Sequence, residues 1–353
     1  MIQEFIRFKL TLSAYSPNAI YRGLDYPIDF NRIIQLAQLL LVLFCEYNNI
    51  LVTLFFRKFL LKGVLKMRKS LITTAVLGAL AASSFVFAAE KETKSDFTTS
   101  GSVGLFSQYI FRGLTQTDRD PALQGNFDIN HSSGLYLGMW GSNVSWLRDK
   151  YGVGQTSESE TFYKSGGNLE IDVYGGFKSE IGKTGLGVDL GALQYYYPGT
   201  ERGRDAESAG FAKANTTEVY GALSYGWLQA KYSHVVSKDA WGWGRTFTVN
   251  TDARGTYYAE LNATVPIGEL IGSGPLKGLS GIAHYGKQEF DNDTALGMPS
   301  YEDYKLGLSN AFDNGVVIGA FWTDTKGARD SAWTYNGRNI GKETGTVFLQ
   351  KTF

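Results

Sequence analysis

The sequence predicts an all-β protein, namely a transmembrane antiparallel β-barrel of about 12 strands with up-and-down connections. Three observations predict it. Apolar and polar residues alternate with a period of two over most of the chain after Phe97. Long and short connections follow each other in turn, as in barrels whose loops differ at the two ends. Downstream of the export signal described below, no apolar run is long enough for a membrane-spanning helix.

The composition of the 353-residue chain fits this class. Gly is abundant (42) and Pro rare (7), and the 21 Tyr and 22 Phe are typical of strands. Acidic residues outnumber basic ones after Ala89, which weighs against a nucleic-acid partner. The one cysteine, Cys45, precedes Ala89, so the later part has no disulfide and no thiol for catalysis or metal binding.

A secretory signal peptide is predicted inside the chain, over residues 67–88. Met67-Arg68-Lys69 is basic, residues 71–82 are apolar, and Val86-Phe87-Ala88 places small residues before a cleavage site. We expect cleavage after Ala88, a periplasmic N-terminal tail over 89–96, and an outer-membrane barrel over 97–353.

The preceding residues, 1–66, have two interpretations. The favoured interpretation is that the true start is Met67 and that residues 1–66 are upstream sequence translated by mistake, because a signal peptide normally begins its chain. The other is a genuine membrane anchor formed by the apolar runs 33–44 and 50–56. Glu46 and Asn48 lie between these runs and weaken that interpretation.

The strands are predicted from the alternation itself. Leu123 and Phe127 lie on one parity, whereas Asp128 and its neighbours on the other parity are polar. Each segment has roughly the ten residues that a tilted membrane strand needs. The predicted strands are 97–112, 122–131, 134–146, 168–180, 185–197, 216–225, 227–237, 255–265, 278–288, 302–312, 315–325 and 344–353.

A soluble sandwich or a lipocalin-like barrel also alternates, with its apolar residues inward. Three features favour the membrane barrel. The polar face carries charges on many strands, which a packed core does not accept. Aromatic residues cluster at strand ends, as in Tyr195-Tyr196-Tyr197. The chain ends in Phe353 on an alternating strand, like the signal read by the outer-membrane assembly machinery, although Lys351 departs from that pattern.

Several stretches resemble a known family. FRGLTQTDRDPALQG (Phe111 to Gly125) is similar to the hallmark of the TorF-type putative porins, a group also known as a conserved hypothetical outer-membrane protein family. LEIDVYGGF, EVYGALSYG and YYAELNATVPI follow in order, and the last strand ends in KTF. The resemblance covers 97–353 and implies an outer-membrane channel without naming a solute.

The predicted function is a porin-like channel for passive diffusion of small hydrophilic solutes. Acidic residues outnumber basic ones on the predicted inner face, which favours a weak preference for cations. The alternative is a closed barrel with ligand-binding or adhesive extracellular loops. The pore-lining candidates are Arg112, Asp128, Glu170, Asp172, Lys178, Asp189, Glu218, Lys231, Glu260 and Lys305.

Arg112 has two interpretations. It is predicted to end the first strand on the polar face, where it would select solute charge at a constriction or rim. Alternatively, it pairs with a loop carboxylate such as Asp118 or Asp120 and fixes the loop 113–121. Inward glycines, among them Gly191, have no side chain, so they are expected to leave open space along parts of the lumen wall.

Other chemistry is less well supported by the residues. We expect no catalytic site, no cofactor and no metal, and the expected partners are outer-membrane lipid, the assembly machinery through Phe353, and small hydrophilic solutes. An outer-membrane hydrolase is the remaining alternative, with His131, His234 (near Asp239) and His284 as its possible bases. Asp291-Asn292-Asp293 lacks the glycine and distal Glu of a calcium loop.

Overall fold

A computed structural model describes residues 95–149, 163–201, 212–244, 251–271, 274, 276–328 and 331–353. The predicted upstream extension, the signal peptide and most of the predicted N-terminal tail lie outside these residues.

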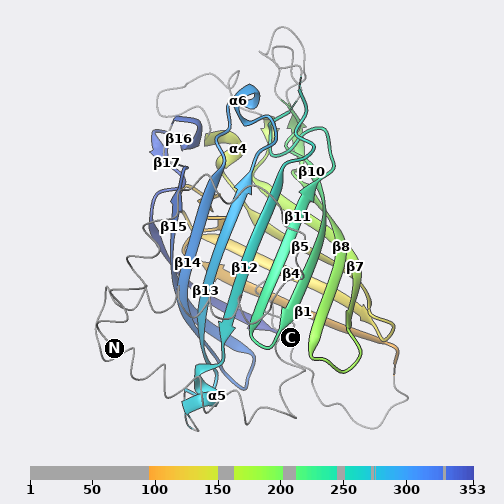
Figure 1. The fold of residues 1–353 in the computed structure, drawn as a ribbon. Coiled ribbons are helices and arrows are strands. Elements are labelled where there is room, and N and C mark those ends of the chain that lie inside the picture. Colours follow the sequence, from red (N-terminus) through yellow and green to blue (C-terminus); the bar gives the residue numbers. More distant parts are fainter. Residues whose placement is uncertain are drawn as a thin grey trace, which may run out of the picture. The chain divides into compact units, whose positions relative to one another are not determined.

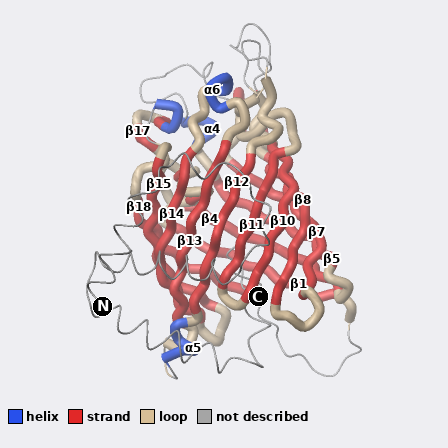
Figure 2. Tube along the Cα trace, in the orientation of Figure 1, coloured by secondary structure: helices blue, strands red, loops and turns tan. Residues whose placement is uncertain are grey.

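Within the described residues, twelve antiparallel strands close a barrel, as the sequence predicts (Figures 1 and 2). Each strand is hydrogen-bonded to the next one along the chain, and β1 pairs with β18 to complete the circle. The connections are therefore up-and-down. The barrel strands are β1 (Phe97–Phe106), β4 (Ala122–His131), β5 (Leu135–Asn143), β7 (Leu169–Glu180), β8 (Leu186–Tyr196), β10 (Thr216–Tyr225), β11 (Leu228–Val235), β12 (Tyr257–Val265), β13 (Leu279–Glu289), β14 (Tyr301–Ala311), β15 (Val316–Lys326) and β18 (Thr344–Thr352).

The first predicted strand, 97–112, is wrong in its second half. β1 ends at Phe106, and the chain then forms a separate hairpin of β2 (Ile110–Phe111) and β3 (Leu114–Thr115). The predicted boundaries of the other strands agree with the observed ones to within a few residues, because alternation ends where a turn begins.

The two ends of the barrel differ. The described residues of the connections 107–121, 144–168, 197–215, 236–256, 290–300 and 327–343 lie at one end of the barrel, which we call the long-loop end. It carries α4 (Trp146–Asp149), β6 (Tyr163–Gly166), β9 (Gly199–Glu201), α6 (Asp293–Leu296), η5 (Ser331–Trp333), β16 (Thr334–Tyr335) and β17 (Arg338–Asn339). Figure 1 labels α4, α6, β16 and β17 above the barrel and α5 (Ile267–Ile271) at the opposite, short-turn end.

The outer face of the barrel is apolar along its strands. Leu123 is 57% exposed, and Phe127 and Val173 are exposed too, whereas Glu170 and Asp172 on the other parity are buried. A monomeric soluble protein rarely exposes a continuous apolar surface that encircles it. The exposed side chains of this face include Leu105, Leu137, Leu190, Val219, Leu261, Leu306, Ile318, Val347 and Leu349.

Buried aromatic residues fill the long-loop end. Trp146, Trp333 and Tyr335 come from the connections, and they pack into one hydrophobic cluster with Tyr195 of β8 and Tyr301 of β14. The cluster lies inside the ring of strands, so this end of the lumen is largely occupied.

The inward glycines Gly176 and Gly191 accommodate tyrosines and do not leave the wall open, so the expectation of open space at these two positions is wrong. A Cβ on Gly191 would lie 2.5 Å from the hydroxyl oxygen of Tyr220. A Cβ on Gly176 would lie 2.8 Å from the hydroxyl oxygen of Tyr136. These hydroxyls contact each other, and Tyr136 donates a hydrogen bond of 2.6 Å to Asp189. The glycines therefore make room for a tyrosine network across the lumen.

The C-terminal residue continues the sheet beyond β18. Phe353 exchanges backbone hydrogen bonds with Gly101, at 2.9 and 3.0 Å, and its side chain is exposed. In the described part of the chain, no helix is long and apolar enough to cross a membrane.

Candidate functional site

The candidate site is built on the β2–β3 hairpin, which we call the inward hairpin. Its two-residue turn is formed by Arg112 and Gly113, with φ angles of 46° and 78°. Two positive φ angles are typical of the tight hairpin turn whose twist matches its strands. Glycine adopts this conformation readily, but arginine does so at a cost. The fold therefore keeps an arginine where glycine or asparagine would be less strained.

The inward hairpin lies inside the barrel. A Cβ on Gly113 would meet the Asp303 side chain of β14 at 2.5 Å and Thr325 of β15 at 2.7 Å. Both residues are almost fully buried on the inner face. The Thr115 backbone N–H donates to the Ile340 carbonyl at 2.9 Å, which ties the hairpin to the connection before β18. The connection after β1 therefore folds back into the lumen at the long-loop end.

Arg112 joins the hairpin to two strands. Its Nη2 atom lies 2.8 Å from Glu218 Oε2 on β10, and its Nη1 atom donates to Gln288 Oε1 on β13 at 3.0 Å. The side chains of Arg112 and Glu218 are 7% and 0% exposed, so this ion pair is buried. The guanidinium also lies over the rings of Tyr258 and Trp241, at 4.3 and 5.1 Å. Burial lowers the pKa of Arg112, but Glu218 and its neighbours raise it by more, so the group stays charged.

Three carboxylates lie at the level of Arg112. Glu170 accepts a hydrogen bond of 2.9 Å from the Tyr109 hydroxyl, and Glu218 accepts one of 3.0 Å from Tyr195. Burial raises the pKa of Tyr109, as do Glu170 and Asp172, so its phenol keeps the proton that it donates. The Asp172 Oδ1 atom is buried and has no hydrogen-bond partner among the described residues. This level, which we call the upper level, thus has three acids and one base among the candidates.

The other six candidates lie deeper in the barrel and are half-buried. On this lower level, Lys178 is opposite Asp189 in the sheet, and Lys231 is opposite Glu260. Lys305 completes the bases, with its Nζ 5.0 Å from the centre of the Phe321 ring. Asp128 completes the acids and accepts a hydrogen bond of 2.6 Å from Tyr174. Three acids and three bases balance here, so the excess acid among the candidates lies at the upper level.

Both sequence interpretations of Arg112 required a correction. The residue does not end the first strand, and its carboxylate partner is Glu218 on a barrel strand. The loop carboxylate Asp118 lies instead 3.4 Å from Arg338 Nη1, at the surface. Arg112 nevertheless fixes its loop, as one interpretation held, because its side chain joins the hairpin to β10 and β13.

Some residues of the site were missed. Asp303 is buried, accepts from the Tyr258 hydroxyl at 2.7 Å, and lies 3.0 Å from His284 Nε2. Asp303 shares its parity with Lys305, and Tyr258 shares its parity with Glu260, so alternation could have identified both. The role of Trp241 in stacking on Arg112 has no such signal, because Trp241 lies in a connection.

The remaining histidines make local contacts. His131 lies 2.8 Å from Ser133 in a turn at the short-turn end, and His234 lies 3.2 Å from the Tyr232 hydroxyl on the outer side. In the possible calcium stretch, Asn292 donates to Asp291 and Asp293 accepts from Thr294. Within the described ranges, no group of three or more His, Cys, Asp or Glu residues could hold a metal ion.

Some solved structures resemble the barrel at low similarity. A KdgM porin has 9% identity over 72% of this chain and 99% of its own, with a TM-score of 0.39. OccD3 (OpdP) from Pseudomonas aeruginosa has 13% identity over 74% of this chain and 66% of its own, with a TM-score of 0.34. OccAB3 from Acinetobacter baumannii has 11% identity over 73% and 65%, with a TM-score of 0.36. Identities and TM-scores at this level carry no argument about what this chain binds or transports.

A family model gives a firmer assignment. No curated protein matches the sequence. The family described as "Bacterial protein of unknown function (Gcw_chp)" matches residues 90–353, and this range contains every strand of the barrel and the inward hairpin. The porin name suggested by the sequence resemblance is not part of that description. The chain therefore belongs to the Gcw_chp family of bacterial proteins of unknown function.

Proposed function

We propose that this protein is a channel of the bacterial outer membrane, through which small hydrophilic solutes diffuse passively. The observation that carries the proposal is a closed barrel with an exposed apolar outer face and a charged, hydrogen-bonded interior. A closed barrel satisfies all its backbone hydrogen bonds between strands, which is the condition for crossing lipid with strands. Export through the predicted signal peptide, with cleavage after Ala88, agrees with this location.

The inward hairpin is the proposed constriction. It brings Arg112 against Glu218 and Gln288 and occupies the lumen at the long-loop end together with the aromatic cluster. A barrel of twelve strands has a narrower lumen than the wide-pore porins of 16–18 strands. We therefore expect a small conductance and a low size limit for solutes.

The proposed weak cation preference arises at the upper level. Glu170, Asp172 and Glu218 face one arginine there, whereas acids and bases are equal among the candidates on the lower level. A passing cation is attracted by the carboxyl oxygens at this level, and an anion is repelled by them. The channel has no enzymatic role in this proposal.

A closed barrel that binds a ligand with its long connections is the second candidate. The aromatic cluster across the long-loop end favours it, because the cluster leaves little room for passage. Planar-bilayer recording of the refolded protein separates the two. Steady conductance with a reversal potential shifted towards cations supports the channel. No conductance above the lipid background, from protein that migrates as a folded barrel before heating, supports the closed barrel.

A further inference from the structure

His284 lies on the inner face of β13, within a hydrogen-bonded cluster that has no part in the proposed function. Its Nε2 atom is 3.0 Å from Asp303 Oδ1 on β14 and 2.9 Å from the Tyr258 hydroxyl oxygen on β12. Its Nδ1 atom is 2.6 Å from Asn262 Oδ1 and 3.7 Å from Glu260 Oε2, both on β12. The imidazole side chain is 8% exposed, so these polar groups replace most of the bulk water around it.

The hydrogen bonds of the cluster indicate a proton on each ring nitrogen. Asn262 donates from its amide nitrogen to Glu260 at 2.9 Å, so the amide oxygen faces Nδ1 and accepts from it. The Tyr258 hydroxyl donates to Asp303 Oδ2 at 2.7 Å, so its proton is not directed at Nε2. Nε2 then donates to Asp303 Oδ1, because a carboxylate only accepts. An imidazole that donates from both nitrogens is positively charged, so the contacts fit the imidazolium form of His284.

The neutral forms of His284 cannot make the same set of hydrogen bonds. Without a proton on Nε2, the lone pair of that atom faces Asp303, and the single hydroxyl proton of Tyr258 can reach only one of the two acceptors. Without a proton on Nδ1, the lone pair faces the Asn262 oxygen, and turning the amide would remove the donor from Glu260. In either case a buried hydrogen bond is lost, so the arrangement of the cluster depends on the charge of His284.

Basic residues also face this cluster. Lys305 of β14 is opposite His284 in the sheet, and Lys231 of β11 is opposite Glu260. The carboxylates of Asp303 and Glu260 favour a positive charge on the ring, whereas the two lysines oppose it. Histidine is the side chain that ordinarily changes its charge between about pH 5 and 8. A change of pH is therefore the natural signal for this cluster.

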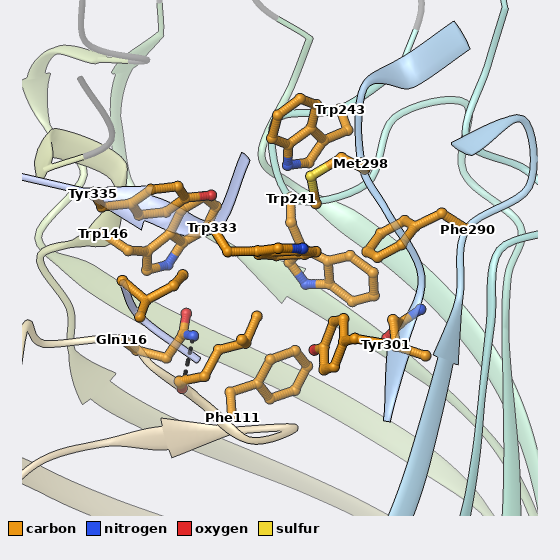
Figure 3. A pocket seen from close by; sticks show the side chains of 13 residues that line it. Phe111, Gln116, Trp146, Trp241, Trp243, Phe290, Met298, Tyr301, Trp333 and Tyr335 are labelled. Carbon is orange, nitrogen blue, oxygen red and sulfur yellow. Dashed lines mark hydrogen bonds between the residues drawn. The ribbon is translucent and has the colours of Figure 1, made fainter. Parts of the chain in front are cut away.

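Two members of the cluster contact the inward hairpin. A Cβ on Gly113 would lie 2.5 Å from the Asp303 side chain, and the guanidinium of Arg112 lies 4.3 Å from the centre of the Tyr258 ring. Phe111 of the same hairpin packs against the aromatic cluster (Figure 3), and this apolar contact does not depend on pH. A change at the imidazole should therefore loosen the hairpin in part, through Asp303 and Tyr258.

We propose that His284 is a pH-sensitive support of the inward hairpin. In its imidazolium form it holds Asp303 and the Tyr258 hydroxyl beside the turn. Loss of its proton breaks one hydrogen bond of the cluster, and the hairpin leaves the lumen more readily as the pH rises. The proposal gives the constriction a means of regulation, and it rests on the proposed channel only for its effect on conductance.

Limited proteolysis within 107–121 tests the proposal without requiring conductance. The folded, detergent-solubilised protein is treated with proteinase K from about pH 5.5 to 8.5, where histidine ordinarily changes its charge. Each cleavage rate is divided by the rate for the heat-unfolded protein at the same pH, which removes the pH dependence of the protease. We expect this ratio to rise about 3- to 10-fold over the range, as for the loss of one hydrogen bond. Mass spectrometry of the fragments locates the cleavage.

His284→Gln has no titrating ring, so its cleavage ratio should stay constant with pH. The sequence contains three histidines, and His131→Gln and His234→Gln are therefore matched controls that should keep the wild-type rise. Folding of each variant is checked by its gel mobility before and after heating. A constant ratio in the wild-type protein would overturn the proposal. A rise that persists in folded His284→Gln would also overturn it, because another group would then cause the effect.

A second measurement does not depend on the folding of His284→Gln. Nitrogen NMR signals of isotopically labelled histidine distinguish a doubly from a singly protonated imidazole, and the two control variants identify the signal of His284. Its change of charge should follow the same pH dependence as the cleavage, and a ring that keeps one charge state throughout would overturn the proposal. In planar bilayers, conductance should rise with pH. A rise in cleavage without conductance at any pH would overturn only the channel, and conductance with a constant cleavage ratio only the role of His284.

Discussion

Arg112 and Glu218 form a buried ion pair across the lumen, with 2.8 Å between Nη2 and Oε2. One residue is in the turn of the inward hairpin and the other is on β10, 106 positions later in the chain. Because Arg112 also adopts a positive φ angle, the pair holds a strained turn in place. The contact between these two residues therefore holds the proposed constriction in place.

Removing one partner of this pair should release the hairpin. Arg112→Met leaves the Glu218 carboxylate buried without its cation, and such a loss costs about 3–5 kcal/mol in a protein interior. The hairpin can avoid that cost by leaving the lumen, so we expect a larger single-channel conductance and faster proteolysis within 107–121. Glu218→Met should act in the same direction.

The double variant Arg112→Met/Glu218→Met is the control for that experiment. Replacing both charges of a buried pair by apolar groups is often neutral or stabilising. The double variant should therefore regain much of the wild-type conductance and protease resistance. Wild-type conductance in both single variants, with folded protein, would show that the hairpin does not limit passage.

The upper-level carboxylates should set the ion preference. Glu170→Gln combined with Asp172→Asn removes two acids from the level of Arg112 without adding bulk. A loss of about 0.4–1 kcal/mol of attraction would lower the cation-to-anion permeability ratio by a factor of about two to five. Reversal potentials in a salt gradient measure this ratio. Asp313→Asn, in a turn at the short-turn end, is the matched control and should leave the ratio unchanged. An equal effect of the double variant and of Asp313→Asn would show that the upper-level carboxyl groups do not set the ion selectivity.

A methyl group added to a glycine that lies against a tyrosine hydroxyl should destabilise the barrel. Gly191→Ala places a Cβ at 2.5 Å from the Tyr220 hydroxyl and 2.8 Å from the Gly175 carbonyl oxygen. We expect a loss of about 1–3 kcal/mol in the free energy of unfolding, as for other overpacked positions. Urea unfolding in detergent or lipid measures it. Gly345→Ala on β18 meets no atom within 4 Å and should change stability far less. Equal stability of the two variants would contradict the packing described for Tyr220.

The terminal aromatic residue should matter for assembly more than for the folded barrel. Phe353→Ala removes an exposed ring that lies beside Gly101, and the backbone pairing with that residue remains possible. We expect less folded protein in the outer membrane of cells, but near-normal refolding of purified protein in detergent. Phe312→Ala is the control, since Phe312 is also an exposed aromatic residue after a strand. A normal amount of folded Phe353→Ala protein in cells would contradict the predicted assembly signal.

The sequence by itself determined the strands and which side chains face inward. Successive Cβ atoms of a strand point to opposite faces, so the alternation of Phe127 with Asp128 predicts one residue outside and one inside. The structure places them so, and it also places Glu170 and Asp172 inside. Parity alone could equally have identified Asp303, because its strand neighbour Lys305 was recognised.

Only the tertiary structure decided the end of the first strand and the partner of Arg112. Residues 107–112 look like a continuation of β1, since nothing local in the sequence specifies that the chain turns into the lumen. That turn depends on contacts with Glu218, Gln288 and Ile340, which are distant in sequence and meet only when the barrel closes. In the same way, an inward glycine looks like empty space in a sequence. Tyr220 fills the space beside Gly191 because a neighbouring strand brings it there, and such packing across strands is a property of the closed barrel.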